Sequence, residues 1–356
     1  MSVINHGGRG QQIDPDLLDF SANINPIGVP LELKRKISAN LNQLIYYPDP
    51  DYCGLRKQIA AAYKLDFKNI WVGNGSVSLI YEAVRVLNVR TALVFAPTFG
   101  EYEAAMRKME IDIRTFQLNK QQSFQYNADE IISYLKQNSD IDFVCLCNPN
   151  NPTGSMINTN AIRMIVNYCN ANHIWLMLDE AFNDFLLEDR QTFSFEQDIR
   201  PQDKVIIIKS LTKFYAIPGI RLGIAVCPSA DLVTRLKERM EPWSVNTFAA
   251  LIDENIINDS DYKQATAEWL KTEKGYLERE LSKIRDINFY SSQVNFYLLK
   301  SPRMDLAKKL MRRKVLVRDC SNFRMLDSSY IRIAVRSHRE NEVLIKSLKQ
   351  ILESSL

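Results

Sequence analysis

Lys213 stands among side chains that bind anions, directly after an apolar segment. The segment VIIIKS at 205–210 has the pattern of a buried strand and runs into SLTKFYAIPGIRLG. Ser210, Thr212 and Lys213 therefore follow the carboxyl end of a strand, where open α/β sheets bind ligands. An arbitrary lysine is usually a surface charge. These hydroxyls, together with Arg221, whose planar fork suits phosphate, instead favour a nucleophilic amine beside a bound phosphate.

A turn bracketed by glycines offers a second group of anion-binding donors. In WVGNGSVSLIYEA the turn is Gly73, Asn74 and Gly75, between a strand pattern and a helix pattern that begins at Ser76. The first backbone amides of such a helix can receive an anion. Taken alone, the segment is equally typical of an ordinary tight turn between a strand and a helix.

Two further strand patterns end in polar side chains. Asn151 follows the buried segment of CNPNNPTG, and Asp179 ends the segment LMLDEAF. A lone aspartate at such a position more often caps the following turn. A cofactor that works as an electron sink, however, needs a carboxylate at its pyridinium nitrogen and a hydrogen bond to its phenolic oxygen. Asp179 and Asn151 could supply those two groups.

Short apolar runs alternate with amphipathic helix patterns through the middle of the chain, which predicts the elements that position these side chains. This rhythm is typical of βαβ units in a mostly parallel, doubly wound α/β sheet. The predicted strands lie at 70–72, 92–97, 143–149, 174–180 and 205–210. Helix patterns follow Gly75, in SLIYEAVRVL, and Asn160, in AIRMIVNYCN, and both are long enough for right-handed crossovers.

The pattern changes at about residue 253, which predicts a second, smaller α+β domain. Long polar helices end near 285 and are followed by FYSSQVNFYLLK, a basic helix, VLVRDC, YIRIAVR and a last helix. Ser337 and Glu340 have the spacing of a capping box at the start of that helix. We predict an N-terminal segment at 1–44 that packs with the small domain and the active site, a large domain at 45–252 and the small domain at 253–356. The N-terminal LLDFSANINPIGVP is expected to be a loop.

Composition excludes several classes of function. The net charge is +3, from 45 basic and 42 acidic residues spread along the chain, so a nucleic-acid partner is not expected. The densest basic run, at 308–314, has the spacing of a solvated helix face. No apolar run is long enough for a membrane span, and the six cysteines form no CxxC pair, which favours a reducing cytoplasm and gives no metal-ligand pattern.

Five motifs, GNGS, PTFGEY, NPNNPTG, DEAF and SLTKFYAIPGIRLG, occur in this order over nearly the whole chain. Together they resemble the class I/II aminotransferase family of fold-type I pyridoxal-phosphate enzymes. The resemblance implies that Lys213 holds pyridoxal 5'-phosphate as a Schiff base, that Phe99 stacks on its ring, and that Tyr47 reaches the cofactor phosphate of a partner subunit in a homodimer. The cofactor-binding set it implies is Tyr47, Gly75, Ser76, Phe99, Asn151, Asp179, Ser210, Thr212, Lys213 and Arg221.

Within this family, further segments resemble the threonine-phosphate decarboxylases of cobalamin biosynthesis. These segments are HGG, LDFSANINP, YPDPDY, PWSVN, VRDCSNF and RIAVRS. The resemblance implies decarboxylation of L-threonine O-3-phosphate to (R)-1-amino-2-propanol O-2-phosphate, or of L-serine O-phosphate to ethanolamine phosphate. The histidinol-phosphate aminotransferases are the alternative. The implied substrate contacts are His6, Gly7, Asn23, Asn151, Arg318 and Arg332, the last of which would bind the α-carboxylate.

A substrate with both a phosphate and a carboxylate needs several cations, and Arg318, Arg332 and Arg336 could provide them. Arg332 and Arg336 are an even number of residues apart in YIRIAVR, so we expect both on one face of a strand. The sequence does not separate decarboxylation from transamination, because both use the same groups. Nor does it choose between threonine phosphate and serine phosphate, since one methyl group is worth only ~1–3 kcal/mol. Ser76, where the decarboxylases usually have an acidic residue, and Asp319 beside Arg318 depart from the pattern without an assigned role.

Overall fold

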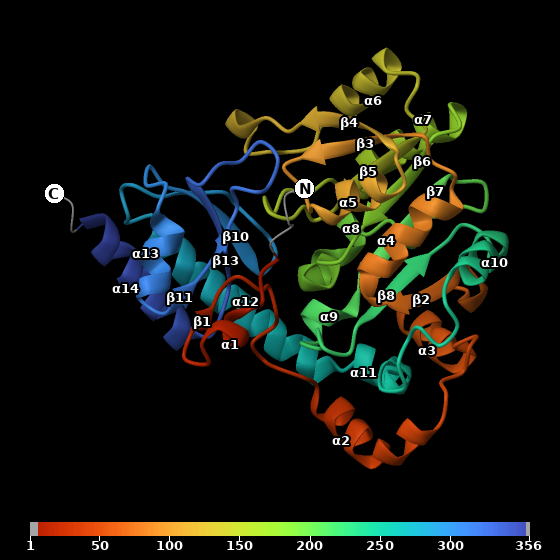
Figure 1. Cartoon of the computed structure of the whole chain (residues 1–356), viewed down its shortest axis with the longest axis horizontal. Helices are drawn as coiled ribbons and strands as arrows, with labels where there is room; N and C mark the ends of the chain where they lie inside the picture. The colour runs from red at the N-terminus through yellow and green to blue at the C-terminus, as the bar shows by residue number, and fades with distance from the viewer. Residues whose placement is uncertain (1–5, 354–356) are drawn as a thin grey trace.

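The computed structural model describes residues 6–353, and its largest element is a seven-stranded sheet (Figure 1). β8 runs antiparallel to both of its neighbours, and the other pairs, from β7 to β4, are parallel. The inner strands are buried on both faces, which explains their continuous apolar sequences. The strand order is β2 (Ile70–Asn74), β8 (Leu222–Val226), β7 (Val205–Ser210), β6 (Trp175–Asp179), β5 (Phe143–Cys147), β3 (Thr91–Ala96) and β4 (Asp112–Gln117).

Helices cover this sheet and connect its parallel strands. α4 packs beside α5 and α10, and α6 packs beside α7 (Figure 1). The short helix α9 (Leu211–Phe214) directly follows β7 and carries Lys213. The longer helices of this region are α3 (Cys53–Tyr63), α4 (Gly75–Val86), α5 (Glu101–Lys108), α6 (Ala128–Gln137), α7 (Thr159–Ala171) and α10 (Ala230–Arg239).

A second layer of structure, in blue and teal in Figure 1, is built on a four-stranded antiparallel sheet. Its strand order is β12 (Arg318–Asp319), β13 (Tyr330–Ala334), β10 (Phe296–Lys300) and β9 (Asn288–Phe289). The helices packed around it are α12 (Ser260–Leu281), α13 (Leu306–Arg312) and α14 (His338–Glu353). Its buried core, which includes Leu277, Tyr297 and Leu348, is separate from the core of the large sheet. The domain boundaries at 44 and 252 stay a prediction.

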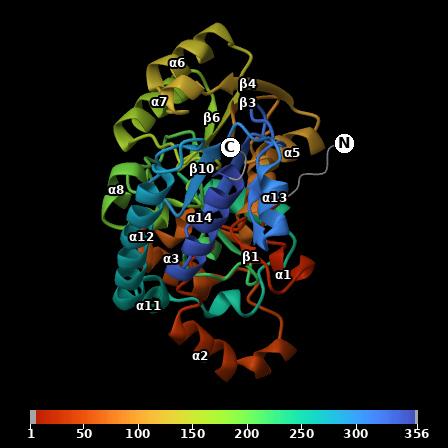
Figure 2. The ribbon, with the colours of Figure 1, turned by 90° about the vertical axis from the view of Figure 1, so that its left-hand side faces the viewer.

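The N-terminal segment joins both layers. The short helix α1 (Gly10–Ile13) is followed by β1 (Leu18–Asp19), which pairs in parallel with β11 (Val315–Leu316). α2 (Leu31–Ala39) and the 3-10 helix η1 (Leu41–Ile45) then form an arm that projects from the body in both views (Figures 1 and 2). We call residues 31–47 the projecting arm.

The structure confirms the five predicted strands of the large domain, the helices after Gly75 and Asn160, and the capping box, in which Glu340 accepts hydrogen bonds from the backbone and side chain of Ser337. In the basic helix, Leu306 and Leu310 are buried. Two strands of the large sheet were not anticipated. β4 is a half-exposed edge strand, and β8 begins at the end of the motif SLTKFYAIPGIRLG, which was interpreted by its chemistry alone. The N-terminal loop prediction was wrong where β1 forms. In the part of the chain that is described, no helix is long and apolar enough to cross a membrane.

Candidate active site

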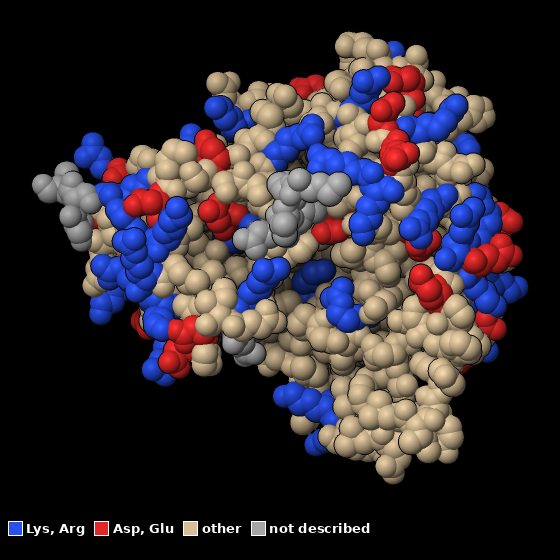
Figure 3. Space-filling view, in the orientation of Figure 1, with Lys and Arg blue, Asp and Glu red and all other residues tan. Residues whose placement is uncertain are grey.

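The carboxyl ends of β5, β6 and β7 face a pocket of about 1270 Å³. In the space-filling view the molecule is hollowed near its centre, with Lys and Arg side chains on the rim and in the depth (Figure 3). The pocket brings together predicted residues from all three parts of the chain. Those that line it are His6, Gly7, Asn23, Phe99, Asn151, Lys213, Arg318, Arg332 and Arg336.

Lys213 is half-buried at the wall of this pocket. Its Nζ donates a hydrogen bond to Ser210 Oγ at 3.0 Å, and Ser210 Oγ lies 2.8 Å from Thr212 Oγ1. Burial lowers the pKa of Lys213 to about 8, with Asp179 opposing the shift and Arg221 adding to it. A lysine with this pKa has an appreciable neutral fraction near pH 7, which a nucleophilic amine requires.

Gly75 and Arg221 form a cradle beside Lys213. Gly75 has a φ of +77°, and a Cβ built there would lie 2.2 Å from Arg221 Nη2. Its backbone N–H donates to the Arg221 carbonyl at 2.9 Å, and the adjacent Ser76 is buried at the first turn of α4. A glycine is therefore required for the guanidinium to approach the start of this helix. The helix amides, the two hydroxyls and the guanidinium together suit a phosphate group.

Asp179 is a buried carboxylate at the end of β6. Its Oδ1 accepts the Ala181 N–H at 2.9 Å, and its Oδ2 accepts the Tyr102 hydroxyl at 2.7 Å. Burial raises the pKa of Asp179, and the hydrogen bond from Tyr102 and the charge of Lys213 offset this rise only in part. Each carboxylate oxygen can accept a second hydrogen bond, so Asp179 can still accept one from a ring nitrogen.

Asn151 and Arg332 meet at the centre of the pocket. Arg332 Nη1 donates to Asn151 Oδ1, and its Nη2 donates to the Ser21 carbonyl at 2.8 Å. Within residues 6–353, neither amide atom of the buried Asn23 side chain has a hydrogen-bond partner, and Arg332 Nε also lacks one. Buried polar groups are normally paired, so these atoms mark hydrogen bonds that a ligand could complete.

Arg318 and His6 lie at the edges of the pocket. Arg318 Nη2 donates to Asn322 Oδ1 at 2.7 Å, and its guanidinium lies 4.9 Å from the centre of the Phe323 ring. His6 Nε2 lies 2.7 Å from Glu101 Oε1. A Cβ on Gly7 would lie 2.1 Å from the Ser21 carbonyl oxygen, so only glycine fits there.

Arg336 and Tyr47 lie off the elements that carry the other predicted residues. Arg336 lies beyond the end of β13, so the strand does not extend to it, but it lines the same pocket as Arg332. Its guanidinium also pairs with Glu340 through Nε at 3.2 Å and Nη2 at 2.7 Å, because the start of α14 holds Glu340 next to it. Tyr47 lies outside the pocket, on the projecting arm, where its ring is 79% exposed and lies 4.8 Å from that of Trp243.

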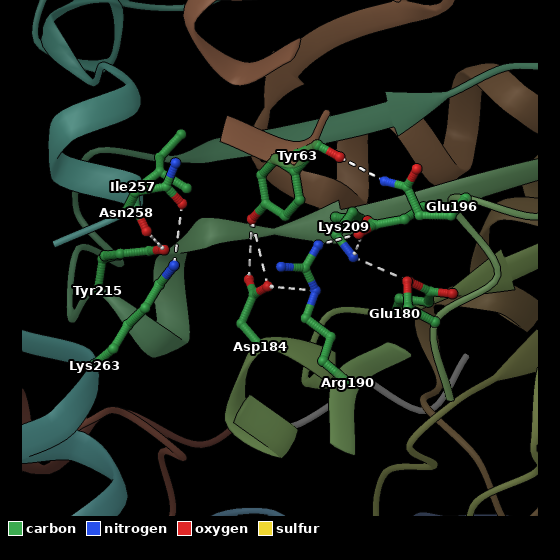
Figure 4. A network of polar contacts seen from close by, with 12 residues as sticks. Tyr63, Glu180, Asp184, Arg190, Glu196, Lys209, Tyr215, Ile257, Asn258 and Lys263 are labelled. Carbon is green, nitrogen blue, oxygen red and sulfur yellow. Dashed lines mark hydrogen bonds and ion pairs between the residues drawn. The ribbon is translucent and has the colours of Figure 1, made fainter. Parts of the chain in front are cut away.

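A cluster of buried charges lies behind the site (Figure 4). Side chains alternate across a strand, so Lys209 points away from the face that Ser210 supplies. Lys209 Nζ lies 2.9 Å from carboxylate oxygens of both Glu180 and Glu196. Arg190 also pairs with Glu196, and it completes the cluster with Asp184 and Tyr63. Here burial lowers the pKa of Lys209, but Glu196 and Glu180 outweigh that effect and the net shift is upward.

The donors around Lys213 fit pyridoxal phosphate. The cradle at Gly75, Ser210, Thr212 and Arg221 would hold its phosphate, Asp179 its ring nitrogen and Asn151 its phenolic oxygen. Phe99 lines the pocket beside these groups. Tyr102 is buried beside Asp179 and Phe182 lines the pocket, and the sequence did not single out either residue. Their only sequence signal is a spacing of three residues after Phe99 and Asp179, respectively.

Comparisons with known proteins agree with this geometry. The family model described as aminotransferase class I and II matches residues 15–348. The threonine-phosphate decarboxylase of Salmonella typhimurium is 36% identical, over 98% of this chain and 96% of its own. Among solved structures, a histidinol-phosphate aminotransferase from Clostridium acetobutylicum superposes with a TM-score of 0.88 at 30% identity, covering 95% of this chain and 100% of its own. The L-threonine-O-3-phosphate decarboxylase of Porphyromonas gingivalis superposes with a TM-score of 0.81 at 27% identity, covering 94% and 99%. The match over most of the length, with the site geometry, establishes that this chain belongs to the aminotransferase class I and II family.

Proposed function

We propose that this protein is a pyridoxal-phosphate-dependent carboxy-lyase that decarboxylates L-threonine O-3-phosphate to (R)-1-amino-2-propanol O-2-phosphate in cobalamin biosynthesis. The observation that carries the proposal is the combination in one pocket of Lys213, with its lowered pKa, and two buried arginines, Arg318 and Arg332. A phosphorylated amino acid carries two anionic groups, and two separate guanidinium groups match them. The identity to the Salmonella decarboxylase supports the choice within the family.

We assign substrate binding to the residues whose hydrogen bonds are incomplete. Arg332, with its free Nε, would hold the α-carboxylate, and the unpaired amide of Asn23 would contact the substrate beside it. Arg318 and His6, at the pocket edges, would bind the phosphate, with Gly7 allowing the N-terminal segment to pass close to Ser21. Because Asn23, Arg318 and Arg332 are buried, their hydrogen bonds to a charged ligand would be stronger than the same bonds in water.

Lys213 would move the proton at the substrate Cα. Bound pyridoxal phosphate supplies an electron sink for the pair left when a bond to Cα breaks. Arg332 and Asn23 fix the carboxylate, and therefore decide whether the bond to carbon dioxide or the bond to hydrogen is presented for cleavage. When carbon dioxide leaves, Lys213 Nζ is the group placed to return a proton to Cα.

The purified protein separates the two family activities directly. With pyridoxal phosphate and L-threonine O-3-phosphate, we expect release of carbon dioxide and formation of aminopropanol phosphate. With histidinol phosphate and 2-oxoglutarate, we expect no glutamate. Glutamate formation in the second mixture, with no carbon dioxide released in the first, would show that the protein is an aminotransferase and would overturn this proposal. L-serine O-phosphate is included as a third substrate, because a pocket distinguishes one methyl group by only ~1–3 kcal/mol.

We propose that the active form is a homodimer in which Tyr47 reaches the cofactor phosphate of the other subunit. The projecting arm exposes a series of large apolar side chains, and its visible surface in Figure 3 carries few charges. Such a continuous exposed apolar surface is typical of a protein interface. The exposed side chains are Leu31 (61%), Leu41 (53%), Leu44 (60%), Ile45 (77%), Tyr46 (63%) and Tyr47 (79%).

Light scattering tests the dimer. We expect a dimer for the wild type and a monomer for Ile45→Asp, which places a charge on the exposed apolar arm. Met164→Asp serves as the control, because Met164 is also exposed, at 44%, but lies on α7 rather than on the arm. A wild-type monomer with full activity would rule the dimer out.

We also propose a cytoplasmic location. All six cysteines are free, and five of them are buried. Unpaired thiols of this kind are typical of reducing compartments. Fractionation of the native host, with the protein recovered outside the cytoplasm, would contradict this location.

A further inference from the structure

Tyr102 connects two of the groups that would hold the cofactor ring. It is fully buried on α5, three residues after Phe99. Its hydroxyl donates to Asp179 Oδ2 at 2.7 Å. Its ring meets the Phe99 ring edge-on, with centroids 5.6 Å apart and planes at 82°. One side chain therefore contacts both the proposed partner of the ring nitrogen and the proposed stacking ring.

Asp179 depends on its few donors to stay ionised. The carboxylate is 3% exposed, and burial raises its pKa. The Tyr102 hydroxyl is the largest influence in the opposite direction, ahead of the charge of Lys213 and the Ala181 N–H. Hydrogen bonds to a charged group are stronger than those between neutral groups, so this donor favours the carboxylate over the neutral acid.

The phenol remains a donor over the whole accessible pH range. Burial raises the pKa of Tyr102 well above its usual value, and Asp179 raises it further. A tyrosine beside a carboxylate does not lose its proton in preference to that carboxylate. The direction of the hydrogen bond is thus fixed, from Tyr102 to Asp179.

We propose that Tyr102 is a positioning residue, which holds Asp179 as an oriented carboxylate against the cofactor nitrogen and braces Phe99 against the cofactor ring. The inference rests on the proposed binding of pyridoxal phosphate, but not on the choice of substrate. A protonated ring nitrogen makes the bound cofactor a better electron sink, and only an ionised partner keeps that nitrogen protonated. Tyr102 acts on the reaction through Asp179 without touching the substrate.

Tyr102→Phe tests the hydroxyl alone, and Tyr126→Phe is its matched control. Tyr126 is also a buried tyrosine, but its hydroxyl donates to the Cys147 carbonyl at 2.9 Å. Both variants lose one buried hydrogen bond, whereas only the first loses a bond to Asp179. The measurements are the dissociation constant for pyridoxal phosphate, the pH at which the visible absorbance of the bound cofactor changes, and the kinetic constants.

For Tyr102→Phe we expect cofactor affinity to fall by at most about tenfold, because Asp179 without this donor is less readily ionised and pairs less well with the ring nitrogen. The absorbance midpoint should move to higher pH, because a less positive ring makes the nitrogen joined to Lys213 less acidic. The kcat should fall while KM for substrate stays within twofold. Tyr126→Phe should lower thermal stability and leave these values unchanged. Equal affinity and equal midpoint in wild type and Tyr102→Phe would overturn the inference.

A second pair of variants covers the case in which Tyr102→Phe does not fold. Asp179→Asn removes the buried charge, so the pair Asp179→Asn and Asp179→Asn/Tyr102→Phe avoids an unpaired carboxylate. We expect these two to differ by less than twofold in cofactor affinity, because the partner of Tyr102 is already neutral. A further tenfold loss in the double variant would show that Tyr102 does not act through Asp179. If the wild type binds no pyridoxal phosphate, the proposed function itself fails, and the two failures are distinct.

Discussion

Lys209 and Lys213 lie four residues apart, where β7 passes into α9, yet their amines are held in opposite ways. Lys209 is buried with two carboxylates at 2.9 Å, and its pKa is raised (Figure 4). Lys213 lines the pocket with a hydroxyl at 3.0 Å, faces Arg221 as well as Asp179, and its pKa falls to about 8. Burial lowers the pKa of both amines. The number of nearby carboxylates therefore decides which amine stays protonated and which can lose its proton and react.

The largest expected difference between the two lysines is in the rate of the reaction after Lys213 is removed. Lys213→Ala should lower the rate of carbon dioxide release by ~10²–10⁴-fold, because it removes the group proposed to transfer the Cα proton. The circular dichroism spectrum should match that of the wild type. An unfolded Lys213→Ala protein, or one that retains a tenth of wild-type activity, would contradict the division between a reactive and a structural lysine.

Substitution of the other lysine, Lys209, should lower the stability of the fold. Lys209→Met leaves Glu180 and Glu196 buried without their shared cation, and breaking a buried ion pair in this way costs ~3–5 kcal/mol. Urea unfolding of the protein without cofactor measures this loss. Lys204→Met is the control, since Lys204 is only partly buried and contacts the face of Trp175. If both variants unfold at the same urea concentration, the buried cluster does not stabilise the fold.

The lowered pKa of Lys213 should make both cofactor capture and stability depend on pH. Cofactor capture needs a neutral amine, so its rate should rise about tenfold between pH 7 and 9, with a midpoint near the Lys213 pKa of about 8. The folded pKa lies below the ordinary lysine value, so the unfolded chain binds more protons between pH 8 and about 10.4. Wild-type stability should therefore rise with pH in that window relative to Lys213→Met. A capture rate that increases only above pH 10 would mean that Lys213 is an ordinary lysine.

The sequence was sufficient for features that are local to a strand and its following turn. The positions of Lys213, Asp179 and Asn151 followed from apolar runs that end in polar residues, because the carboxyl ends of parallel strands meet at one edge. The pairing of Arg336 was missed although Glu340 stands four residues later, because a strand pattern was extended past its end at Ala334.

Contacts between distant segments could not be derived in the same way. Tyr102 and Asp179 are 77 residues apart, and their hydrogen bond requires that α5, which follows β3, and the end of β6 approach one another across β5. The two carboxylates beside Lys209 belong to Glu180, directly after β6, and to Glu196, in a loop after α8 (Arg190–Phe193). The sequence could not show that Lys209 would pair with both. A single lysine in an apolar strand gave no sign of which partners it would meet.

The smallest expected effect concerns Arg221, a charged neighbour that Lys213 has and that changes its pKa. Arg221 lowers the pKa of Lys213, and its removal in Arg221→Met should move the midpoint of amine labelling in the cofactor-free protein to higher pH. The shift should be smaller than that from exposing the amine to water, because burial is the larger cause of the lowered pKa. Asp179→Asn should move the same midpoint to lower pH, since Asp179 favours the charged amine. Opposite shifts from these two variants, with Lys209 unreactive in both, would establish that charge balance rather than burial alone distinguishes the two lysines. Shifts in the same direction would disprove it.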